Sequence, residues 1–353
     1  MIVEAIKELV DRGEIDADTA ERCMHEIMSG EATQAQVAAF LTALRIRGEN
    51  PAIISAMARV MRNFAIPVKV SLRRRLIDTC GTGGDSIKTI NVSTAAGLIT
   101  AAAGGYVAKH GNRSFTGYCG SADFLEEIGV RIEVGPEKVA KCIESLGFGF
   151  IFAPIYHPSM RNVAPVRREI AVRTVFNVLG PLTNPARVNA QVLGVFSSDL
   201  MEEVAEALKL DGREEALIFH GIGGMDEISI FSETEAIWLR EGDIRRRRLR
   251  PEDFGLEKAK AEEIIVRGRD ECVEKTLKAL SGRLGKGHPL TRLLLANASA
   301  ALIVAGLADD LKHGVDLAWQ AMESGKVIKL LEQLVKETGG DKSRFEMRME
   351  VIE

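Results

Sequence analysis

The chain has 353 residues, of which 46 are Lys or Arg and 50 are Asp or Glu, giving a formal net charge of −4. Hydrophobic residues make up 46% and charged residues 27%, which is typical of a globular protein with two domains, or with one large α/β domain and an appendage. Disordered and collagen-like chains are excluded. The mild acidity also argues against nonspecific nucleic-acid binding by the whole surface.

Cysteine usage and hydropathy indicate the compartment. The cysteines are odd in number, form no CxxC pair and have no histidine nearby at metal-ligand spacing; they are Cys23, Cys80, Cys119, Cys142 and Cys272. Reduced thiols of this kind are typical of the cytoplasm. The charged N-terminus lacks the apolar core of a secretory signal, and the small-residue stretch over 94–108 is too short to span a bilayer. We therefore expect a cytoplasmic protein with no membrane role.

The first 67 residues predict short amphipathic helices. The clearest covers 33–47 and places four apolar side chains on one face, namely Val37, Phe40, Leu41 and Leu44. Thr33 followed by Gln36 fits a capping box. A further helix carries apolar residues from Ile53 to Phe64 before Pro67 stops it. These patterns predict a small helical unit.

From residue 76, apolar runs end in glycine-rich turns and are each followed by a helical stretch, which is typical of βα units with a parallel sheet. We predict strands over 76–79, 106–108, 148–153, 191–196 and 216–220. We predict helices over 93–103, 122–128, 137–145, 201–208 and 290–305. A β-rich passage covers 227–248, and a polar tail from Lys336 is expected to be mobile.

The fold class that follows is α/β, with a small N-terminal helical domain and a larger α/β domain built on a mostly parallel central sheet. We place the helical domain at residues 1–68, joined in space by a helical segment near 163–188. The larger domain then covers 69–353.

The sharpest local feature is the sequence DTCGTGGD over 78–85, followed by NVST over 91–94 at a predicted helix start. Glycines allow backbone N–H groups to approach an anion, and a helix N-terminus adds partial positive charge, so the pair suits a phosphate or diphosphate. A tight βα turn with an ordinary Ser cap is the alternative. Neither GxGxxG nor GxxxxGK[ST] is present, which argues against an NAD site or a P-loop.

A second loop, KHGNRS over 109–114, follows the short predicted strand 106–108. Open parallel sheets bind ligands at the carboxyl ends of their strands, so this loop should face the same crevice as the first. Lys109 can then offset phosphate charge. The sequence GSAD over 120–123 comes next, where we expect Ser121 to cap a helix. A solvated surface loop is the alternative.

Two further segments carry charge. VRRE over 166–169 precedes TVFNVLGPLTNP over 174–185, which predicts a helix ending in a Pro-bounded turn, with Arg167 able to grip a carboxylate. A surface ion pair is the alternative for that arginine. Asp226 and Glu227 are adjacent carboxylates that suit Mg²⁺, since that ion takes oxygen ligands and substrate phosphates. An exposed acidic turn is the alternative for them.

Together, GTGGD, NVST, KHGNRS with GSAD, VRRE with TVFNVLGPLTNP, and GMDE over 224–227 occur in the order found in anthranilate phosphoribosyltransferases, a family that the chain resembles over most of its length. The resemblance implies a fold of the nucleoside phosphorylase and phosphoribosyltransferase type. It also implies transfer of phosphoribose from phosphoribosyl pyrophosphate (PRPP) to anthranilate in tryptophan biosynthesis, with Mg²⁺ as cofactor. A homodimer through the helical domain is implied too.

The resemblance further implies site residues. Those for PRPP are Gly81, Gly84, Asp85, Thr89, Asn91, Val92, Ser93, Thr94, Lys109 and Ser121. Those for anthranilate are Gly81, His110, Asn112 and Arg167, with His157 nearby. Those for the metal are Ser93, Asp226 and Glu227. The residues expected to carry catalysis are Lys109, Arg167, Asp226 and Glu227.

The stretch FTGYC over 115–119 departs from the family, which usually has short, Ser-rich side chains there, so Phe115 and Tyr118 bear on acceptor preference. Cys119 has no base nearby in sequence and is interpreted as structural rather than nucleophilic. Two other functions stay open: a nucleoside phosphorylase of the same superfamily, and a non-catalytic relative that binds nucleic acid through the arginines of 245–250.

Overall fold

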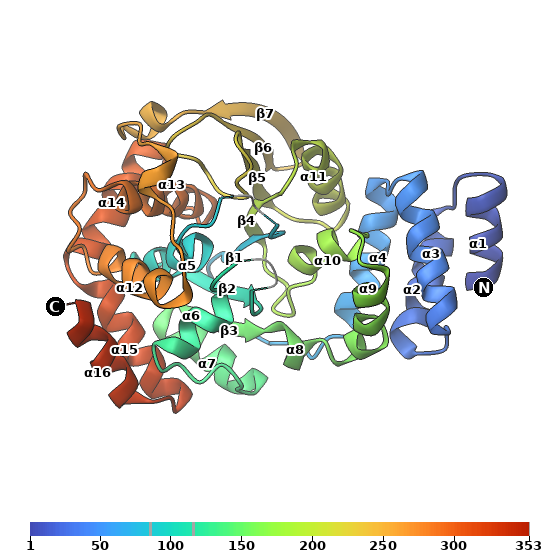
Figure 1. Ribbon diagram of the computed structural model, residues 1–353, viewed down its shortest axis with the longest axis horizontal. Coiled ribbons are helices and arrows are strands. Elements are labelled where there is room, and N and C mark those ends of the chain that lie inside the picture. Colours follow the sequence, from blue (N-terminus) through green and yellow to red (C-terminus); the bar gives the residue numbers. More distant parts are fainter. Residues whose placement is uncertain (85–86, 115–116, 353) are drawn as a thin grey trace.

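The computed structural model describes residues 1–84, 87–114 and 117–352, and within these ranges it has a seven-stranded sheet in a large lobe beside a small helical lobe (Figure 1). The helical lobe begins with α1 (Ile2–Asp11), α2 (Ala17–Ser29), α3 (Gln34–Arg47) and α4 (Pro51–Asn63). Local sequence explains where these helices begin. Asp16 accepts a hydrogen bond from the Thr19 N–H, and the predicted capping box of Thr33 and Gln36 is confirmed.

Two later helices join this lobe. They are α9 (Ala164–Ile170) and α10 (Phe176–Leu182), whose apolar side chains share a core with α1 to α4. The prediction of a single helix before the Pro-bounded turn is wrong, because Ala171 adopts a left-handed φ of 49° and the chain changes direction there. Arg62 of α4 and Asp211 at the end of α11 (Met201–Leu210) form a mostly buried ion pair that links the two lobes.

The sheet has the strand order β3-β2-β1-β4-β5-β6-β7. Its first five strands in that order are parallel, while the last two pair antiparallel, so the prediction of a mostly parallel sheet is confirmed. The strands are β1 (Leu76–Gly81), β2 (Tyr106–Gly111), β3 (Phe148–Phe152), β4 (Ala190–Gly194), β5 (Glu215–Gly221), β6 (Thr234–Arg240) and β7 (Asp243–Leu249). The predicted β-rich passage is therefore the β6-β7 hairpin with its preceding loop.

Helices cover both faces of the sheet (Figure 1). Besides α11, the helices of the large lobe are α5 (Val92–Ala102), α6 (Ser121–Glu127), α7 (Pro136–Leu146), α8 (Ala153–Tyr156), α12 (Arg269–Leu280), α13 (Pro289–Val304), α14 (Leu311–Glu323), α15 (Lys326–Thr338) and α16 (Lys342–Ile352). The helices α5 and α13 are buried almost throughout and form the centre of the larger core. Among the described residues, none of the helices combines the length and apolar content needed to cross a membrane.

The C-terminus corrects one prediction, since a helix stands where a mobile polar tail was expected. Phe345 and Ile352 of α16 are buried in the larger core. Arg344 and Arg348 both form ion pairs with Glu127 at the end of α6. The few apolar residues of this segment were too widely spaced in a polar sequence to indicate that it packs.

Candidate active site

The first glycine-rich loop leaves β1 at its carboxyl end and is held against Asp226. The Gly83 N–H donates to Asp226 Oδ2 at 2.8 Å, and a Cβ added to Gly81 would lie 2.5 Å from the same oxygen. Gly83 and Gly84 have left-handed φ values of 69° and 88°, which favour glycine. Two segments far apart in sequence are therefore joined through one carboxylate, on a residue that is only 8% exposed. Asp85 lies outside the described residues.

The start of α5 is tied to the second loop. Asn91 Nδ2 donates to the Cys119 carbonyl at 2.6 Å and to the Gly120 carbonyl at 3.2 Å, while its Oδ1 accepts from the Thr94 hydroxyl. These bonds fix the helix N-terminus beside the N-terminus of α6, as the sequence analysis expects for an anion site. Ser93 is half-buried one residue into α5.

Other residues predicted to bind PRPP have framework contacts. The Thr89 hydroxyl donates to the Ile264 carbonyl at 2.7 Å, and Thr94 is fully buried. Val92 is buried as well, so its side chain packs in the core. Their side chains therefore hold the loop and helix in place in this structure.

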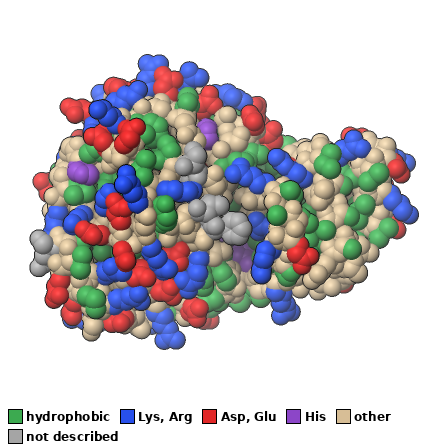
Figure 2. Space-filling view, in the orientation of Figure 1, with side chains coloured by type: hydrophobic (Ala, Val, Ile, Leu, Met, Phe, Trp, Pro, Cys, Tyr) green, Lys and Arg blue, Asp and Glu red, His purple; other side chains and the backbone are tan. Residues whose placement is uncertain are grey.

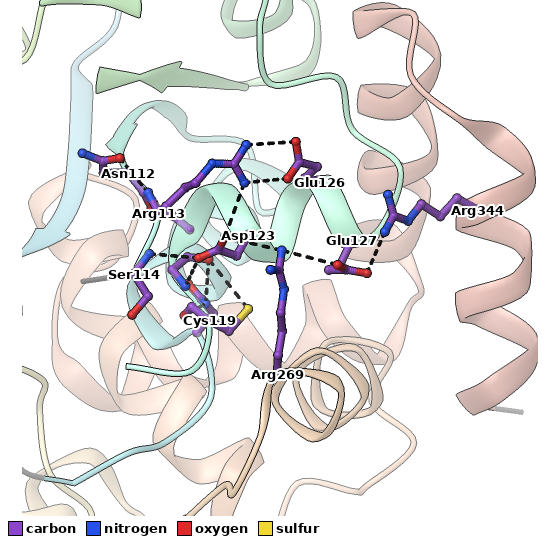
Figure 3. Close-up of polar contacts among 12 residues, drawn as sticks. Asn112, Arg113, Ser114, Cys119, Asp123, Glu126, Glu127, Arg269 and Arg344 are labelled. Atoms are coloured by element: carbon purple, nitrogen blue, oxygen red, sulfur yellow. Dashed lines mark hydrogen bonds and ion pairs between the residues drawn. The ribbon is translucent and has the colours of Figure 1, made fainter. Parts of the chain in front are cut away.

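Asp123 organises the second loop, and the sequence analysis missed it (Figure 3). Its Oδ2 accepts from the N–H groups of Ser114 and Gly120, at 2.9 and 2.8 Å. Its Oδ1 lies 3.4 Å from both Arg113 and Arg269, so the carboxylate draws the two ends of the loop together. The acidic residue three positions after Gly120 is a capping signal that could have indicated this role.

The prediction that Ser121 caps α6 is consequently wrong. Gly120 occupies the cap position, and the Asp123 carboxylate accepts the Gly120 N–H. Ser121 is the first helical residue, and its hydroxyl donates to the Asn112 carbonyl at 3.3 Å. Asn112 itself is exposed, with its Oδ1 accepting from the Arg113 N–H. Phe115 lies outside the described residues, whereas Tyr118 is exposed.

Lys109 lies in β2, where its ammonium group is buried and donates to the His110 carbonyl at 3.2 Å. Asp78 in the neighbouring strand is fully buried and accepts from the His110 N–H and from Asn184 Nδ2. Burial raises the pKa of Asp78, whereas the charge of Lys109 and these hydrogen bonds oppose the rise. Asn184 also donates to the Ala108 carbonyl, so it ties the Pro-bounded turn to β2.

His110 faces a second histidine that the sequence analysis placed only nearby. Its Nε2 lies 3.2 Å from His157 Nε2, and both rings are buried. Burial lowers the pKa of His157 to about 4. The pKa of His110 lies well below its ordinary value, first because of burial and then because of His157 and Lys109. Both rings are therefore neutral at pH 7, and His157 Nδ1 is buried with no hydrogen-bond partner among the described residues.

Arg167 lies on α9 with its guanidinium 5.6 Å above the ring centroid of Phe176. It is half-buried, and no carboxylate forms an ion pair with it in the described part of the chain. Burial lowers its pKa, but arginine stays charged at neutral pH. A half-buried cation of this kind is suited to an anionic group of a ligand.

The predicted segments converge at the carboxyl edge of the parallel strands. The first loop contacts Asp226, Asn91 contacts the second loop, and Asn184 of the third segment donates to Asp78 and to the Ala108 carbonyl. Lys and Arg side chains line the junction between the two lobes on this face of the molecule (Figure 2).

The predicted acidic pair carries the oxygen ligands that Mg²⁺ prefers. Among the described residues there is no cluster of three or more His, Cys, Asp or Glu side chains able to hold a metal ion. Two carboxylates and a hydroxyl beside a phosphate cradle suit an ion that keeps waters and takes substrate oxygens. The sequence predicts three such oxygen donors here, namely Asp226, Glu227 and Ser93.

Comparison with known proteins identifies the family. Residues 73–328 match the model described as "Glycosyl transferase family, a/b domain", and residues 3–65 match "Glycosyl transferase family, helical bundle domain". The fold and site thus define a glycosyltransferase with a helical and an α/β domain. Anthranilate phosphoribosyltransferases of Persephonella marina and Chloroflexus aggregans are 44% and 46% identical, over 95% and 96% of this chain and 98% and 99% of their own. The chain belongs to the anthranilate phosphoribosyltransferase family.

Solved structures give the same result. The crystal structure of anthranilate phosphoribosyltransferase from Thermus thermophilus matches with a TM-score of 0.89 and 43% identity, covering 95% of this chain and 99% of that one. The Saccharomyces cerevisiae enzyme in complex with PRPP and Mg has a TM-score of 0.87 and 27% identity, over 96% and 98% of the two chains. Another structure of the yeast enzyme contains 4-fluoroanthranilate.

The alternatives are not favoured. The arginines of β7 alternate between the two faces of the strand, and several are paired, including Arg246 with Glu202 and Arg248 with Glu235. This is a solvated, ion-paired surface rather than a nucleic-acid site. A contact with the Cys272 thiol, together with burial, raises the pKa of Cys119, so it is not an activated nucleophile.

Proposed function

We propose that the chain transfers phosphoribose from PRPP to the amine of anthranilate, with release of pyrophosphate, as a step of tryptophan biosynthesis. The observation that supports this most is the pair of contacts at one edge of the sheet: the first glycine-rich loop is bonded to Asp226, and Asn91 at the start of α5 is bonded to the second loop. The relatives at 42–46% identity have this activity in their names. An α/β domain matched over residues 73–328 provides the same framework in this chain.

In the proposed reaction, the anthranilate nitrogen forms a bond to the anomeric carbon while the bond from that carbon to the pyrophosphate oxygen breaks. The electron pair leaves with pyrophosphate, and the amine then loses a proton to solvent. An arylamine is neutral at pH 7 and needs no strong base. Catalysis then depends on positioning and on stabilising the charge that grows on the leaving group.

The donor side is proposed to bind in the two glycine-rich loops. The N-terminus of α5 supplies backbone N–H groups to the phosphates, and Lys109 supplies positive charge. The proposed PRPP residues are Gly81, Gly84, Asp85, Thr89, Asn91, Val92, Ser93, Thr94, Lys109 and Ser121.

Mg²⁺ is the cofactor, and we propose that Asp226, Glu227 and Ser93 hold it, where it neutralises phosphate charge. The acceptor is proposed to bind beside the third segment. Arg167 would pair with the anthranilate carboxylate. This role is supported by its guanidinium, which is half-buried and has no carboxylate partner among the described residues. Gly81, His110 and Asn112 complete the proposed acceptor residues.

We propose that two chains associate through the helical domain, residues 1–68, while residues 69–353 bind PRPP. The outer face of this domain exposes Val10 of α1 and Ile46 of α3, at 59% and 75%. The side chain of Arg47 donates to the carbonyls of Leu9 and Val10, which brings these exposed residues to one surface. Hydrophobic side chains are visible on the same lobe in Figure 2. Patches of this kind mark protein interfaces.

The homodimer is tested by the mass in solution. We expect sedimentation of the wild type to give twice the chain mass of 38.5 kDa, and Ile46→Glu to reduce it to the monomer mass. Met347→Glu, which changes an exposed apolar residue on α16, is the matched control. A monomeric wild type would refute the proposal. The cytoplasm is the proposed compartment, since all five cysteines are unpaired thiols.

The activity is tested by following anthranilate fluorescence with PRPP and Mg²⁺, together with a pyrophosphate assay. We expect fluorescence to fall in step with pyrophosphate release, and both to stop when EDTA is added. Incubation with a nucleoside and inorganic phosphate tests the phosphorylase alternative. Release of a free base there, without turnover of anthranilate, would overturn the proposed function.

A further inference from the structure

One arginine, Arg173, lies over the first glycine-rich loop and was not among the predicted site residues. It belongs to the connection between α9 and α10, and its guanidinium carbon is 3.8 Å from the ring centroid of Phe196. A Cβ added to Gly84 would lie 2.9 Å from Arg173 Nη2. The guanidinium therefore lies directly against position 84, where the left-handed φ favours glycine.

The phenyl ring beneath Arg173 belongs to a segment that is hydrogen-bonded to the same loop. Phe196, which follows β4, donates its backbone N–H to Thr82 Oγ1 at 3.0 Å. The Thr82 N–H in turn donates to the Gly194 carbonyl at 2.9 Å. The ring and the loop are therefore joined by two hydrogen bonds. Stacking uses the face of a guanidinium and leaves its N–H edges available to an anion.

The charge of Arg173 has no protein partner in the described part of the chain. It is exposed, and no carboxylate there lies within ion-pair distance of it. On the other side of the loop, the Gly83 N–H is bonded to Asp226, a proposed metal ligand. A carboxylate and an unpaired guanidinium thus border one glycine-rich loop. An anion that takes both a metal ion and a bidentate arginine fits between them, and a diphosphate is such an anion.

We propose that Arg173 binds the diphosphate of PRPP and stabilises the negative charge that develops on the leaving pyrophosphate. This rests on the proposed function. Phe196 is a positioning residue, because it holds the guanidinium over Gly84 without contacting the substrate. Arg167 lies on α9 above a different ring, that of Phe176. In this proposal Arg167 therefore binds the acceptor carboxylate, and Arg173 binds the donor diphosphate.

The test measures kcat and KM for both substrates in Arg173→Gln and Arg173→Lys, with calorimetric titration of pyrophosphate in the presence of Mg²⁺. Arg247→Gln on the edge strand β7 removes one exposed arginine elsewhere and is the matched control. Loss of a charged hydrogen bond predicts about a 10- to 100-fold fall in kcat/KM for PRPP and a similar weakening of pyrophosphate binding. The KM for anthranilate should change by less than about threefold, and Arg173→Lys should retain part of the activity.

The role of Phe196 is tested by a double-mutant cycle. Phe196→Leu should lower kcat/KM for PRPP in the wild type and have little further effect in Arg173→Gln, because the two act together. The urea midpoints of the Arg173 variants should stay near the wild-type value, since Arg173 is exposed.

An unchanged KM for PRPP and unchanged pyrophosphate affinity in Arg173→Gln would overturn the assignment. A loss equalled by Arg247→Gln would overturn it too, as a general charge effect. Absence of turnover in the wild type would instead refute the proposed function, and the pyrophosphate titration would still decide the role of Arg173.

Discussion

The buried pair of His110 and His157 predicts that the fold is destabilised by mild acid. His157 is 5% exposed, and burial lowers its pKa from 6.5 to about 4. The unfolded chain therefore binds a proton near pH 6.5, whereas the folded chain does so only near pH 4. The stability that results is fully present above pH 6.5 and is lost as the pH falls towards 4. The whole shift corresponds to roughly 3 kcal/mol of unfolding free energy.

Urea unfolding followed by circular dichroism tests this prediction at pH 7.5 and 4.5. Between these two values, titration of His157 should remove about 2.5 kcal/mol in the wild type. His157→Gln removes the titrating group, so its loss of stability over the same interval should be smaller by about that amount. His313→Gln, at an exposed position on α14, is the control and should behave like the wild type. Equal losses in the wild type and His157→Gln would refute the reasoning.

Two further changes test the site and its framework. Arg167→Ala should raise the KM for anthranilate by about 10- to 100-fold, because it removes a charged hydrogen bond to the carboxylate, and should leave the KM for PRPP nearly unchanged. Unchanged anthranilate kinetics in a steady-state assay would contradict the role of Arg167. Gly194→Ala should destabilise the fold by about 1–3 kcal/mol and weaken Mg²⁺-dependent activity, because the new Cβ would overlap the backbone oxygen of Asp226. Gly268→Ala is the control, because a Cβ added there meets open space, and it should lower the unfolding free energy by less than half as much. Equal urea midpoints for the two variants would contradict the steric argument.

The sequence predicts most of the framework because its signals are local. Each βα unit shows an apolar run, a glycine-rich turn and a helical stretch, and strand ends in a parallel sheet meet at one edge. That rule alone was enough to expect the loop at Gly83 and the loop after Lys109 in one crevice. The bond from Gly83 to Asp226 adds the acidic pair, which sequence could join to them only through the family resemblance.

What the sequence did not predict depends on contacts between distant segments. Asp123 accepts from Ser114 and Gly120; its spacing from Gly120 is that of a helix cap, but nothing in the local sequence indicates the bond to Ser114. The position of Arg173 over the first loop depends on stacking against Phe196, which follows β4. The helix α16 packs against the large lobe through buried Phe345 and Ile352 and through ion pairs of its arginines with Glu127, which lies far earlier in the chain. Such pairings are fixed by tertiary packing and leave no local pattern.

Calorimetry of PRPP binding tests the central claim most directly. The account predicts that PRPP binds the wild type more tightly with Mg²⁺ than with EDTA. Asp226→Asn combined with Glu227→Gln should abolish that enhancement and reduce turnover severely, while the far-ultraviolet circular dichroism spectrum stays that of a folded protein. Equal PRPP affinity with and without Mg²⁺ in the wild type, or wild-type turnover in the double variant, would contradict the account.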